Sequence, residues 1–589
     1  MGNTEIAKLL RNVAAAYTIK DERKFHFQIV AYQKAADYIE TNPIQLQDYY
    51  KEGKLGDIPG IGVSIKGHLE ELFTKGKVKY FDWALSGIPK TVFVLMDIPS
   101  FGPKKAYRLS EEFGLTNPRT VIRDLKDLAK KGKIAPLKGF GEKSQGDILR
   151  AIGEFREGKG KTTRMVLPFA SEIADRILEY LRKSSDVRDA RVLGSLRRRL
   201  PTVGDIDIAV ASDNPSSVLD HFVSYPLIER IIERGKETSS ILTSGGRQVD
   251  LMVQPTENFG SLLQHFTGSK NHNVALREFS LRKNLSLSEH GIKDLSHKNS
   301  KIHHYPTEEK FYQGIGLSWI PPEIRENTGE IELAAKNRLP KLIETREILA
   351  DFHIHSSFPL EPSHDLGRNT IGEMVKKAIS LGYKYIGFSE HNPSISKHTP
   401  EQVLRLIQAR NEAIDHILSS TKSIRILKLL ETDILPSGKL AIDEKSLQLL
   451  DFSIVSVHSV FSMNKDDMTK RVLLGLSHPK AKLLAHPTGR LLNDRPGYEL
   501  DWPKVLEFCK KNNKALEINA WPTRLDLSDQ IIRQAIDQKV KMIINTDSHA
   551  VDHMDNMKFG VDMARRGWAQ KGDILNTLDY NKFTKWMKL

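Results

Sequence analysis

The sequence contains two sets of acidic and histidine side chains whose spacing fits metal chemistry. In the first set, Asp205 and Asp207 flank Ile206 in an apolar run, and Asp250 stands in a second such run. Because side chains alternate along a strand, both carboxylates should project from one face while Ile206 enters the core. Three converging carboxylates suit Mg²⁺, and two such ions can activate a hydroxyl and stabilise a leaving pyrophosphate. The alternative is that these are ordinary aspartates at solvent-facing strand ends.

A Gly-Ser turn and a basic cluster precede these carboxylates, in the run 194–199 (Gly-Ser-Leu-Arg-Arg-Arg). Backbone N–H groups, hydroxyls and guanidinium groups are common ligands of phosphate. We therefore expect Ser195 and Arg198 to hold the β and γ phosphates of a nucleotide beside the acidic triad.

The second set lies at the ends of short apolar runs in the last 240 residues or so. His353 and His355 are two residues apart, so both imidazoles should share one strand face. Further candidates close later runs, at residues 390–391, 431–433, 458, 486 and 547–549. In a parallel βα barrel all of these strand ends meet at one face. A single such histidine is more often structural, but their repeated position favours a centre for Zn²⁺, Mn²⁺ or Fe²⁺ that makes hydroxide and clamps a phosphodiester.

A short glycine phrase recurs three times, at residues 58–62, 98–102 and 137–141, and each copy precedes a run compatible with a helix. Glycine lets the backbone approach a ligand closely, and the free N–H groups of a following helix attract anions such as DNA phosphates. One such phrase can simply connect two helices, whereas three resemble helix-hairpin-helix motifs. The glycines expected to contact DNA are Gly60, Gly62, Gly102 and Gly141.

Composition excludes several classes of protein. With 589 residues, 39% hydrophobic and 28% charged, the chain is typical of a globular protein with several domains. Its net charge of +14 suits a polyanionic partner. The single cysteine, Cys509, excludes a disulfide framework and a cysteine-ligated zinc site. No apolar run approaches the roughly 20 residues that span a bilayer, and residues 1–5 lack a signal pattern, so we expect a reducing cytoplasm.

The elements that must position these residues change in type along the chain. Residues 1–80 show the periodicity of short amphipathic helices, and residues 162–320 alternate strands with helices. Residues 321–348 indicate a connector. From residue 348 onward, apolar runs alternate with helical patterns about every 30 residues, which is the rhythm of βα units.

The Gly-Ser turn and the acidic triad resemble the catalytic motif of nucleotidyltransferases, specifically of family X DNA polymerases, the group of DNA polymerase beta. Residues 265–270 are similar to its Tyr-Phe-Thr-Gly segment, and residues 319–326 to the end of its thumb. This resemblance covers residues 1 to about 326 and implies that Asp205, Asp207 and Asp250 are the catalytic, metal-binding residues. It implies nucleotide binding by Gly194, Ser195, Arg198, Phe266, Gly268 and Asn273, and DNA binding by Lys34 and Arg277.

The chain departs from this family at two positions. His265 replaces the usual Tyr, so Phe266 and the local backbone should carry most of the discrimination against ribose. The position of the family's lyase lysine holds His68, and a Schiff base requires a primary amine. Lys66 is close but faces differently on the helix, so the resemblance gives no basis for 5′-deoxyribose-phosphate lyase activity. Lys34 matches a lysine that binds the 5′-phosphate.

The histidine-rich region resembles the PHP (polymerase and histidinol phosphatase) domain. This resemblance implies nine metal ligands: His353, His355, Asp365, His391, Glu431, His458, His486, Asp547 and His549. His364 competes with Asp365 for its place, because the segment 358–367 is longer than the family's. The resemblance further implies a Mn²⁺-dependent 3′–5′ exonuclease, with abasic-site endonuclease or trimming of 3′ ends as additional activities. A polymerase half fused to a PHP half is the arrangement of bacterial and archaeal PolX proteins.

We therefore expect a multidomain fold: a helical helix-hairpin-helix N-terminal region, an α+β nucleotidyltransferase palm with a thumb, and a C-terminal (β/α) barrel-like PHP domain. The expected boundaries are 1–85 (DNA-binding helical domain), 86–160 (fingers-like region), 161–260 (palm), 261–326 (thumb), 327–347 (linker) and 348–589 (PHP domain).

The expected function is filling of short gaps in DNA repair, including base excision repair. The expected ions are Mg²⁺ or Mn²⁺ at the triad and Mn²⁺ or Zn²⁺ at the PHP centre. The partners would be gapped or nicked double-stranded DNA and dNTPs, with no membrane, for a cytoplasmic monomer. One alternative makes the PHP half a small-molecule phosphatase or pyrophosphatase. Another is a catalytically silent scaffold that binds DNA ends.

Overall fold

The computed structural model describes residues 3–41, 46, 50, 55–57, 61–98, 101–156, 164–244, 246–297 and 300–589. Its first part is helical and has two separate apolar cores, one drawn from residues 6–85 and the other from residues 92–152. The helices of the first core are α1 (Asn3–Asp21), α2 (His26–Thr41), α4 (Val63–Lys75) and α5 (Lys79–Leu85). Those of the second core are α6 (Lys90–Leu95), α7 (Pro103–Glu112), α8 (Val121–Lys130) and α9 (Glu142–Arg156).

A five-stranded sheet follows, in the order β2-β4-β7-β6-β5. Its strands are β2 (Asp189–Val192), β4 (Ile206–Ala211), β5 (Ile228–Arg234), β6 (Thr238–Thr243) and β7 (Gln248–Gln254), and its helices are α10 (Leu167–Leu181), α11 (Gly194–Arg197) and α12 (Pro215–Phe222). Strands β4 and β7 are parallel, while the other pairings are antiparallel. Ile206 and Ile208 are fully buried as predicted, but β4 begins at Ile206, so Asp205 lies just before the strand.

The next part combines α13 (Phe259–Thr267), α14 (Lys270–Leu281) and α15 (Glu308–Gly314) with a small antiparallel sheet. The sheet contains β8 (Leu285–Ser288), β9 (Gly291–Asp294) and β10 (Ile302–His303). The segment 327–347, which we expected to be a linker, forms α16 (Glu330–Ala335). Its Ile331, Ala334 and Leu342 are buried in the same core as α15, because apolar residues at helical spacing pack there in spite of the charged composition.

Glu308 is a buried anion that ties three segments of this region together. Its carboxylate accepts hydrogen bonds from Arg325 Nη1 at 2.7 Å, from Arg197 Nη2 at 2.6 Å and from Trp319 Nε1 at 3.2 Å. Burial alone would raise the pKa of Glu308, but the guanidinium groups of Arg325 and Arg197 outweigh it and lower the pKa to about 2. Glu308 therefore stays ionised and holds two otherwise unpaired cations in the core.

Replacing Glu308 by Gln is expected to destabilise the fold by about 3–5 kcal/mol, because Arg325 is then left buried without its counter-ion. The ordinary pKa of 4.5 is lowered on folding, so this stabilisation is present above pH 4.5 and is lost as the pH falls toward 2. Urea denaturation followed by tryptophan fluorescence, with Trp319 as a local reporter, measures the change. The control is Glu309→Gln, at the exposed neighbouring position on α15; equal stability of the two variants would contradict the expectation.

The C-terminal part is a parallel barrel. One sheet has the order β11-β12-β13 and the other β14-β15-β16-β17-β18. The strands are β11 (Ala350–Ile354), β12 (Tyr385–Phe388), β13 (Arg425–Lys428), β14 (Glu431–Asp433), β15 (Ser453–Ser456), β16 (Ala481–Leu484), β17 (Ala515–Asn519) and β18 (Met542–Asn545). Only Leu429 and Leu430 separate β13 from β14, so these two form one interrupted strand that joins the sheets.

The first and last strands close the barrel. The backbone N–H of His355 donates to Ser548 O at 2.8 Å, and that of Ser548 donates to His353 O at 3.0 Å. The surrounding helices are α17 (Ile371–Ser380), α18 (Pro400–Ser420), α19 (Glu444–Gln448), α20 (Lys465–Ser477), α21 (Trp502–Asn512), α22 (Asp529–Asp537), α23 (Met557–Arg566) and α24 (Tyr580–Met587). The predicted fold class, with its helical region, α+β sheet and C-terminal barrel, is confirmed.

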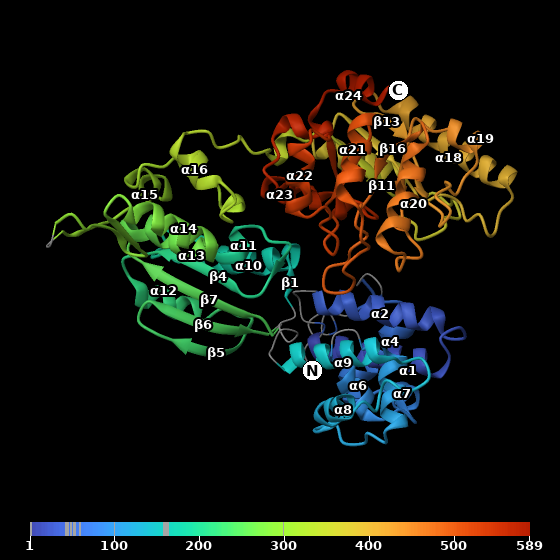
Figure 1. Cartoon of the computed structure of the whole chain (residues 1–589), viewed down its shortest axis with the longest axis horizontal. Coiled ribbons are helices and arrows are strands. Elements are labelled where there is room, and N and C mark those ends of the chain that lie inside the picture. The colour runs from blue at the N-terminus through green and yellow to red at the C-terminus, as the bar shows by residue number, and fades with distance from the viewer. Residues whose placement is uncertain are drawn as a thin grey trace.

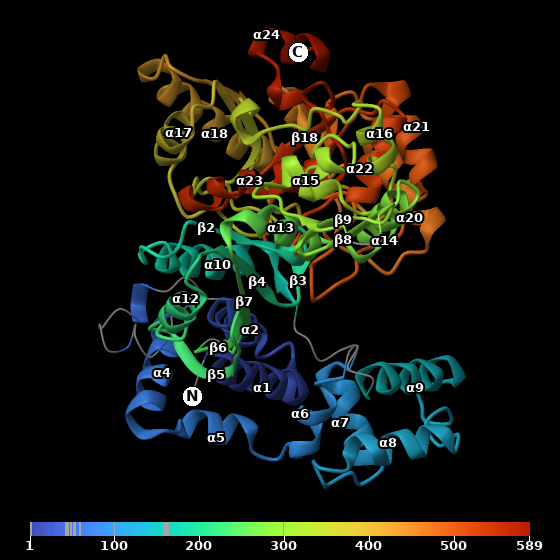
Figure 2. The same cartoon turned by 90° about the vertical axis from the view of Figure 1, so that its left-hand side faces the viewer.

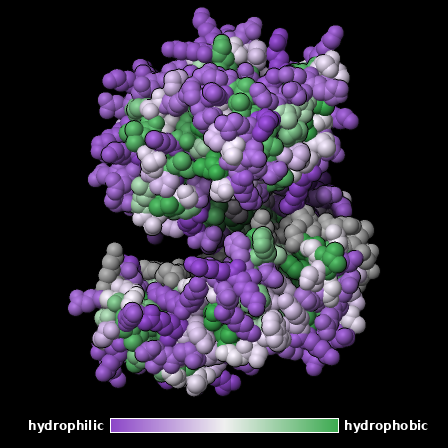
Figure 3. Space-filling view, turned by 90° about the vertical axis from the view of Figure 1, so that its right-hand side faces the viewer, coloured by the Kyte–Doolittle hydropathy of each residue, from purple (hydrophilic) through white to green (hydrophobic). Residues whose placement is uncertain are grey.

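Figure 1 shows the barrel, the five-stranded sheet and the N-terminal helices as separate lobes, with α23 on the side of the barrel toward α13–α16. Figure 2 shows the barrel at the top of the view and α5–α9 at the bottom. Hydrophilic side chains cover most of the face that Figure 3 presents. Among the described residues, no helix combines the length and apolar character required to cross a membrane.

Candidate metal centres

The first centre is the acidic triad on the five-stranded sheet. Asp207 and Asp250 are direct partners in the parallel ladder between β4 and β7, and the exposed Asp205 precedes β4. Burial, together with the negative charges of Asp205 and Asp250, raises the pKa of Asp207 to about 7. Three carboxylates that repel one another in this way form a fitting site for divalent cations, which would relieve the repulsion.

Helix α11 packs directly against this triad. Gly194 has φ +56°, and a Cβ there would lie 2.6 Å from Asp207 Oδ2. Only glycine therefore fits, because it accepts the left-handed backbone and leaves room for the carboxylate. The backbone N–H of Leu193 donates to Asp207 O at 2.8 Å and fixes the turn to the strand. The structure thus brings Gly194 beside Asp207, and Ser195 is the next residue of the same short helix.

The segment 265–273 contacts Arg198 of the basic turn. Arg198 Nη1 donates to the backbone O of Thr267, and a Cβ on Gly268 would lie 2.9 Å from the same Nη1. Phe266 packs against the apolar cluster that contains Leu193. Asn273, on α14, is bonded to the neighbouring helix α13, because its Nδ2 donates to the backbone O of His265 at 2.7 Å. The two motifs are far apart in sequence and meet here.

The residues expected to bind DNA lie in several places. Gly62 and Gly102 are the N-cap residues of α4 and α7, and Gly141 precedes α9. A Cβ at any of these three glycines would meet nothing within 4 Å, so the backbone there is open to a ligand. Arg277 is exposed on α14. Gly60 and the side chain of Lys34 lie outside the described residues.

His68 is held among aromatic rings. Its Nδ1 lies 2.8 Å from the hydroxyl of Tyr32, and its ring stacks on Tyr80 with centroids 4.7 Å apart. Burial lowers the pKa of His68, which favours the neutral ring. Lys66 instead faces Glu70, with Nζ 3.8 Å from the carboxylate. The two side chains therefore point to different surroundings, in line with their different positions on α4.

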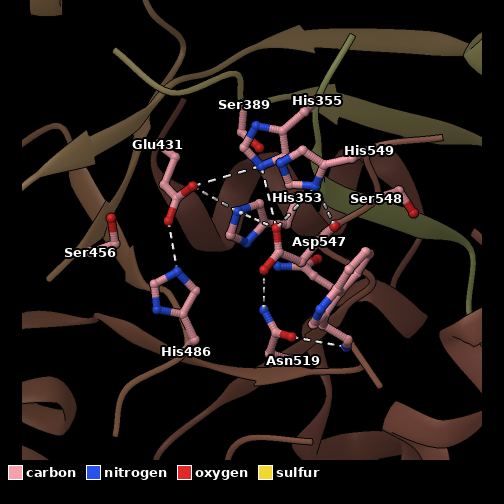
Figure 4. A network of polar contacts seen from close by, with 12 residues as sticks. His353, His355, Ser389, Glu431, Ser456, His486, Asn519, Asp547, Ser548 and His549 are labelled. Atoms are coloured by element: carbon pink, nitrogen blue, oxygen red, sulfur yellow. Dashed lines mark hydrogen bonds and ion pairs between the residues drawn. The ribbon is translucent and has the colours of Figure 1, made fainter. Parts of the chain in front are cut away.

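The second centre lies at the C-terminal ends of the barrel strands, where Glu431 faces His353, His355 and His486 (Figure 4). Five imidazoles have a nitrogen close to its carboxylate oxygens. The nitrogen–oxygen distances are 3.1 Å for His353, 3.7 Å for His355, 3.0 Å for His391, 3.3 Å for His458 and 2.7 Å for His486. His353 and His355 lie at the end of β11, whereas His391, His458 and His486 follow β12, β15 and β16, so the barrel brings residues of four strands together.

Asp547 forms the second acidic position of this centre. Its Oδ1 lies 3.5 Å from His353 Nε2, 3.4 Å from His355 Nε2 and 3.8 Å from His549 Nδ1. The two residues that competed for the ninth position differ in what they face. Asp365 lies 3.5 Å from His391 Nε2 and 3.8 Å from His549 Nε2. His364 Nε2 lies 3.3 Å from Asp433, and its ring lies near those of His458 and His391, so His364, Asp433 and His458 form a separate candidate ligand group.

Several polar atoms of this cluster are buried without a hydrogen-bond partner among the described residues. They include Nε2 of His353, both ring nitrogens of His355 and Oε2 of Glu431. Burial disfavours a charged His391, but the carboxylates of Glu431 and Asp365 outweigh it and raise its pKa to about 10. Groups of three side chains have ligand atoms within 4.8 Å of one another. Such a donor set fits several transition-metal ions.

Sequence reasoning missed the residues that hold the ligands in place. Glu517, on β17, accepts from His353 Nδ1 at 2.8 Å and from the backbone N–H of His486 at 2.7 Å. Asn519 Nδ2 donates to Asp547 Oδ2 at 3.1 Å, and Arg524 Nε lies 3.4 Å from the same carboxylate. Glu517 and Asn519 are polar residues two positions apart in an apolar run, which indicates that both face the same side of a strand. This signal was available in the sequence, because β17 was the one barrel strand to which no candidate had been assigned.

Glu517→Gln is expected to weaken metal binding at this centre about 10–100-fold, because the carboxylate fixes the tautomer and the orientation of His353. Titration of the metal-free protein with Mn²⁺ measures the affinity. Glu444→Gln is a matched control, since Glu444 pairs with His478 at the same 2.8 Å on the surface. Equal affinities in the two variants would contradict the supporting role of Glu517.

Comparison with known proteins agrees with this arrangement. The helix-hairpin-helix domain family matches residues 1–78, the DNA polymerase beta thumb family residues 262–326, and the PHP domain family residues 351–520. The DNA polymerase/3′-5′ exonuclease PolX of Bacillus subtilis is 33% identical over 98% of this chain and 97% of its own length. The chain belongs to the PolX family. The resemblance to family X polymerases with a C-terminal PHP domain is therefore confirmed.

Two further relatives each resemble one half of this PolX chain. DNA polymerase lambda of Rattus norvegicus is 22% identical over 55% of the chain and 56% of its own length. A probable phosphatase of Acetivibrio thermocellus is 28% identical over 34% of the chain and 80% of its own length. Each of these two relatives therefore matches only part of the chain.

Proposed function

We propose that this PolX protein is a DNA-directed DNA polymerase that fills short gaps during DNA repair and that also carries a 3′–5′ exonuclease centre. The observation that carries the polymerase assignment is the pairing of Asp207 with Asp250 beside Gly194, with Asp205 close enough to raise the pKa of Asp207. The substrates are gapped or nicked double-stranded DNA and dNTPs. A monomeric state and a cytoplasmic location stay predictions.

In the polymerase centre, Asp205, Asp207 and Asp250 would hold Mg²⁺ or Mn²⁺, and the N–H groups of the turn at Gly194 and Ser195 would bind the triphosphate together with Arg198. When bound, two such ions activate the 3′-hydroxyl of the primer and stabilise the leaving pyrophosphate. Asp250 would orient the hydroxyl. Phe266 and the backbone at Gly268 would bound the sugar, and the side chain of Asn273 would have to exchange its bond to His265 O for one to the nucleotide.

The glycines that directly precede α4, α7 and α9 support a grip on the DNA backbone, since no atom of the described residues lies within 4 Å of the place where a side chain would stand. We expect a 5′-phosphorylated one-nucleotide gap to be filled faster than an open primer–template of the same sequence, because the hairpins hold the downstream strand. Single-nucleotide incorporation on the two DNAs tests this. Equal rates would contradict gap filling as the preferred reaction.

In the PHP centre, we assign nine ligands for Mn²⁺ or Zn²⁺, with Asp365 rather than His364 as the ninth, because Asp365 faces His391 and His549. When bound, such ions generate hydroxide near neutral pH and stabilise the charge on a phosphodiester. Glu517 orients His353, and Arg524 adds a cation beside Asp547. Abasic-site cleavage and trimming of blocked 3′ ends are compatible with the same chemistry.

A second candidate for the PHP half is a phosphatase acting on a small ester, which the probable phosphatase of A. thermocellus favours. The test compares hydrolysis of a labelled DNA 3′ end with that of p-nitrophenyl phosphate, both with Mn²⁺. Faster removal of 3′ nucleotides supports the exonuclease, and hydrolysis of the ester alone would overturn it. Metal analysis of the purified protein tests the alternative of a catalytically silent scaffold. A protein that contains no bound transition metal would favour that alternative.

A further inference from the structure

Helix α23 of the PHP barrel contacts the basic turn of the polymerase part. Arg566, at the end of α23, is 8% exposed, and its Nη1 donates to the backbone O of Arg198 at 2.8 Å. One turn earlier, Asp562 Oδ2 lies 3.7 Å from Arg199 Nε. Within the barrel, Arg566 Nη2 donates to Asp529, which fixes the guanidinium from its other side. The turn that carries Arg198 is therefore held by a residue 368 positions later in the chain.

Glu326 joins the same contact from the end of the thumb. Its Oε1 accepts from Arg198 Nε at 3.2 Å and from Arg566 Nη1 at 3.2 Å. One carboxylate oxygen thus serves two guanidinium groups, and each charge-assisted bond competes with the other. If either Arg198 or Arg566 is removed, the Glu326 carboxylate interacts with the remaining arginine alone.

Arg198 is committed to protein partners on two sides. Its Nη1 donates to Thr267 O, its Nε to Glu326, and its side chain is only 12% exposed. A carboxylate bound to the guanidinium competes with a phosphate for the same donors. Binding of a triphosphate by Arg198 therefore requires the contact with Glu326 to weaken.

We propose that Arg566 is a positioning residue for the polymerase centre. It draws Glu326 away from Arg198 and anchors the backbone of Arg198, so the PHP barrel helps to set the affinity for the incoming dNTP. This inference rests on the proposed function, in which Arg198 binds the triphosphate. It adds that a residue of the hydrolase domain controls how available that arginine is.

Arg566→Ala is expected to raise the KM for dNTP roughly 3- to 30-fold, with little change in kcat, because Glu326 then binds Arg198 alone. Adding Glu326→Gln should restore most of the affinity, since no charged competitor remains. Single-nucleotide incorporation at a one-nucleotide gap, with the dNTP concentration varied, measures both constants. Rescue by the second substitution is a result that a general loss of structure would not give.

Arg565→Ala is the matched control. Arg565 lies next to Arg566 on the same helix and also crosses to the polymerase side, donating to Glu323 Oε1 and to Ile343 O, both at 2.8 Å. Its loss removes an equivalent interdomain contact and should leave the KM unchanged. Melting temperatures of all variants report whether the two parts remain folded.

Three results would overturn the positioning role: an unchanged KM in Arg566→Ala, an equal rise in Arg565→Ala, or no rescue by Glu326→Gln. If the unsubstituted protein adds no dNTP at all, the proposed polymerase function is wrong and the role of Arg566 falls with it. Normal addition by the unsubstituted protein with an unchanged KM in Arg566→Ala would overturn the positioning role alone.

Discussion

Replacing Asp205 and Asp207 together by alanine is expected to reduce nucleotide addition roughly 10³-fold or more while leaving shortening of DNA 3′ ends intact. The pKa of Asp207 is about 7 because burial and two neighbouring carboxylates oppose its ionisation. The substitution removes this unfavourable charge, so the fold should not be weakened by the lost carboxylates. A loss of activity would then report the loss of the ion-binding site. Extension of a labelled primer and its degradation without dNTP are measured on the same DNA.

Asp213→Ala is the matched control for that variant. Asp213 is an exposed aspartate just beyond the opposite end of β4, so it changes the charge of the same sheet without touching the triad. It should extend the primer at the unsubstituted rate. Persistent extension by the Asp205→Ala, Asp207→Ala protein would show that the triad has been assigned wrongly.

Replacing His353 and His355 by alanine is expected to have the reverse effect, abolishing exonuclease activity while nucleotide addition continues. Both imidazoles are buried, and both lie near Glu431 and Asp547, so their loss removes ligands shared by the two acidic positions. Mn²⁺ titration should show a parallel loss of binding, which separates a ligand defect from a defect in DNA binding. Release of nucleotides from a labelled 3′ end measures the activity.

Because two buried substitutions can disturb the barrel itself, Glu431→Gln provides a second test with almost no change in volume. It removes the charge that five imidazoles surround. It should abolish exonuclease activity as well. His416→Ala, at an exposed position on α18 of the same domain, is expected to retain it. Exonuclease activity at the unsubstituted rate in both His353→Ala, His355→Ala and Glu431→Gln would place the hydrolytic site elsewhere.

Much of both centres could be predicted from the sequence, because the signals are local. The i, i+2 pairs Asp205/Asp207 and His353/His355 mark a strand end, where Asp205 directly precedes β4 and His355 directly follows β11. A ligand at the end of each apolar run follows from βα units. Glycine before a helix likewise predicts the N-caps at Gly62 and Gly102. The pattern and the fold class therefore indicated most of the candidate ligands, whereas the full set of nine, including Asp365, came from the resemblance to the PHP domain.

The supporting residues could not be predicted in the same way, because their partners are set by how the barrel closes and how the domains pack. Glu517 orients His353 across 164 positions of sequence, and Arg566 reaches Arg198 across 368. The charged composition of residues 327–347 also concealed Ile331 and Leu342, which are buried in the same core as α15. Burial of these residues depends on neighbours that composition does not reveal.

The most direct test of two independent centres in one chain is a single reaction on a 5′-phosphorylated one-nucleotide gap with a labelled primer, followed by product length. With Mg²⁺ or Mn²⁺ and the complementary dNTP, the primer should lengthen by one nucleotide; with Mn²⁺ and no dNTP it should shorten from its 3′ end. The Asp205→Ala, Asp207→Ala protein should only shorten the primer, and the His353→Ala, His355→Ala protein should only extend it. Loss of both products in either variant, or neither product in the unsubstituted protein, would contradict the assignment of polymerase and exonuclease to separate metal centres.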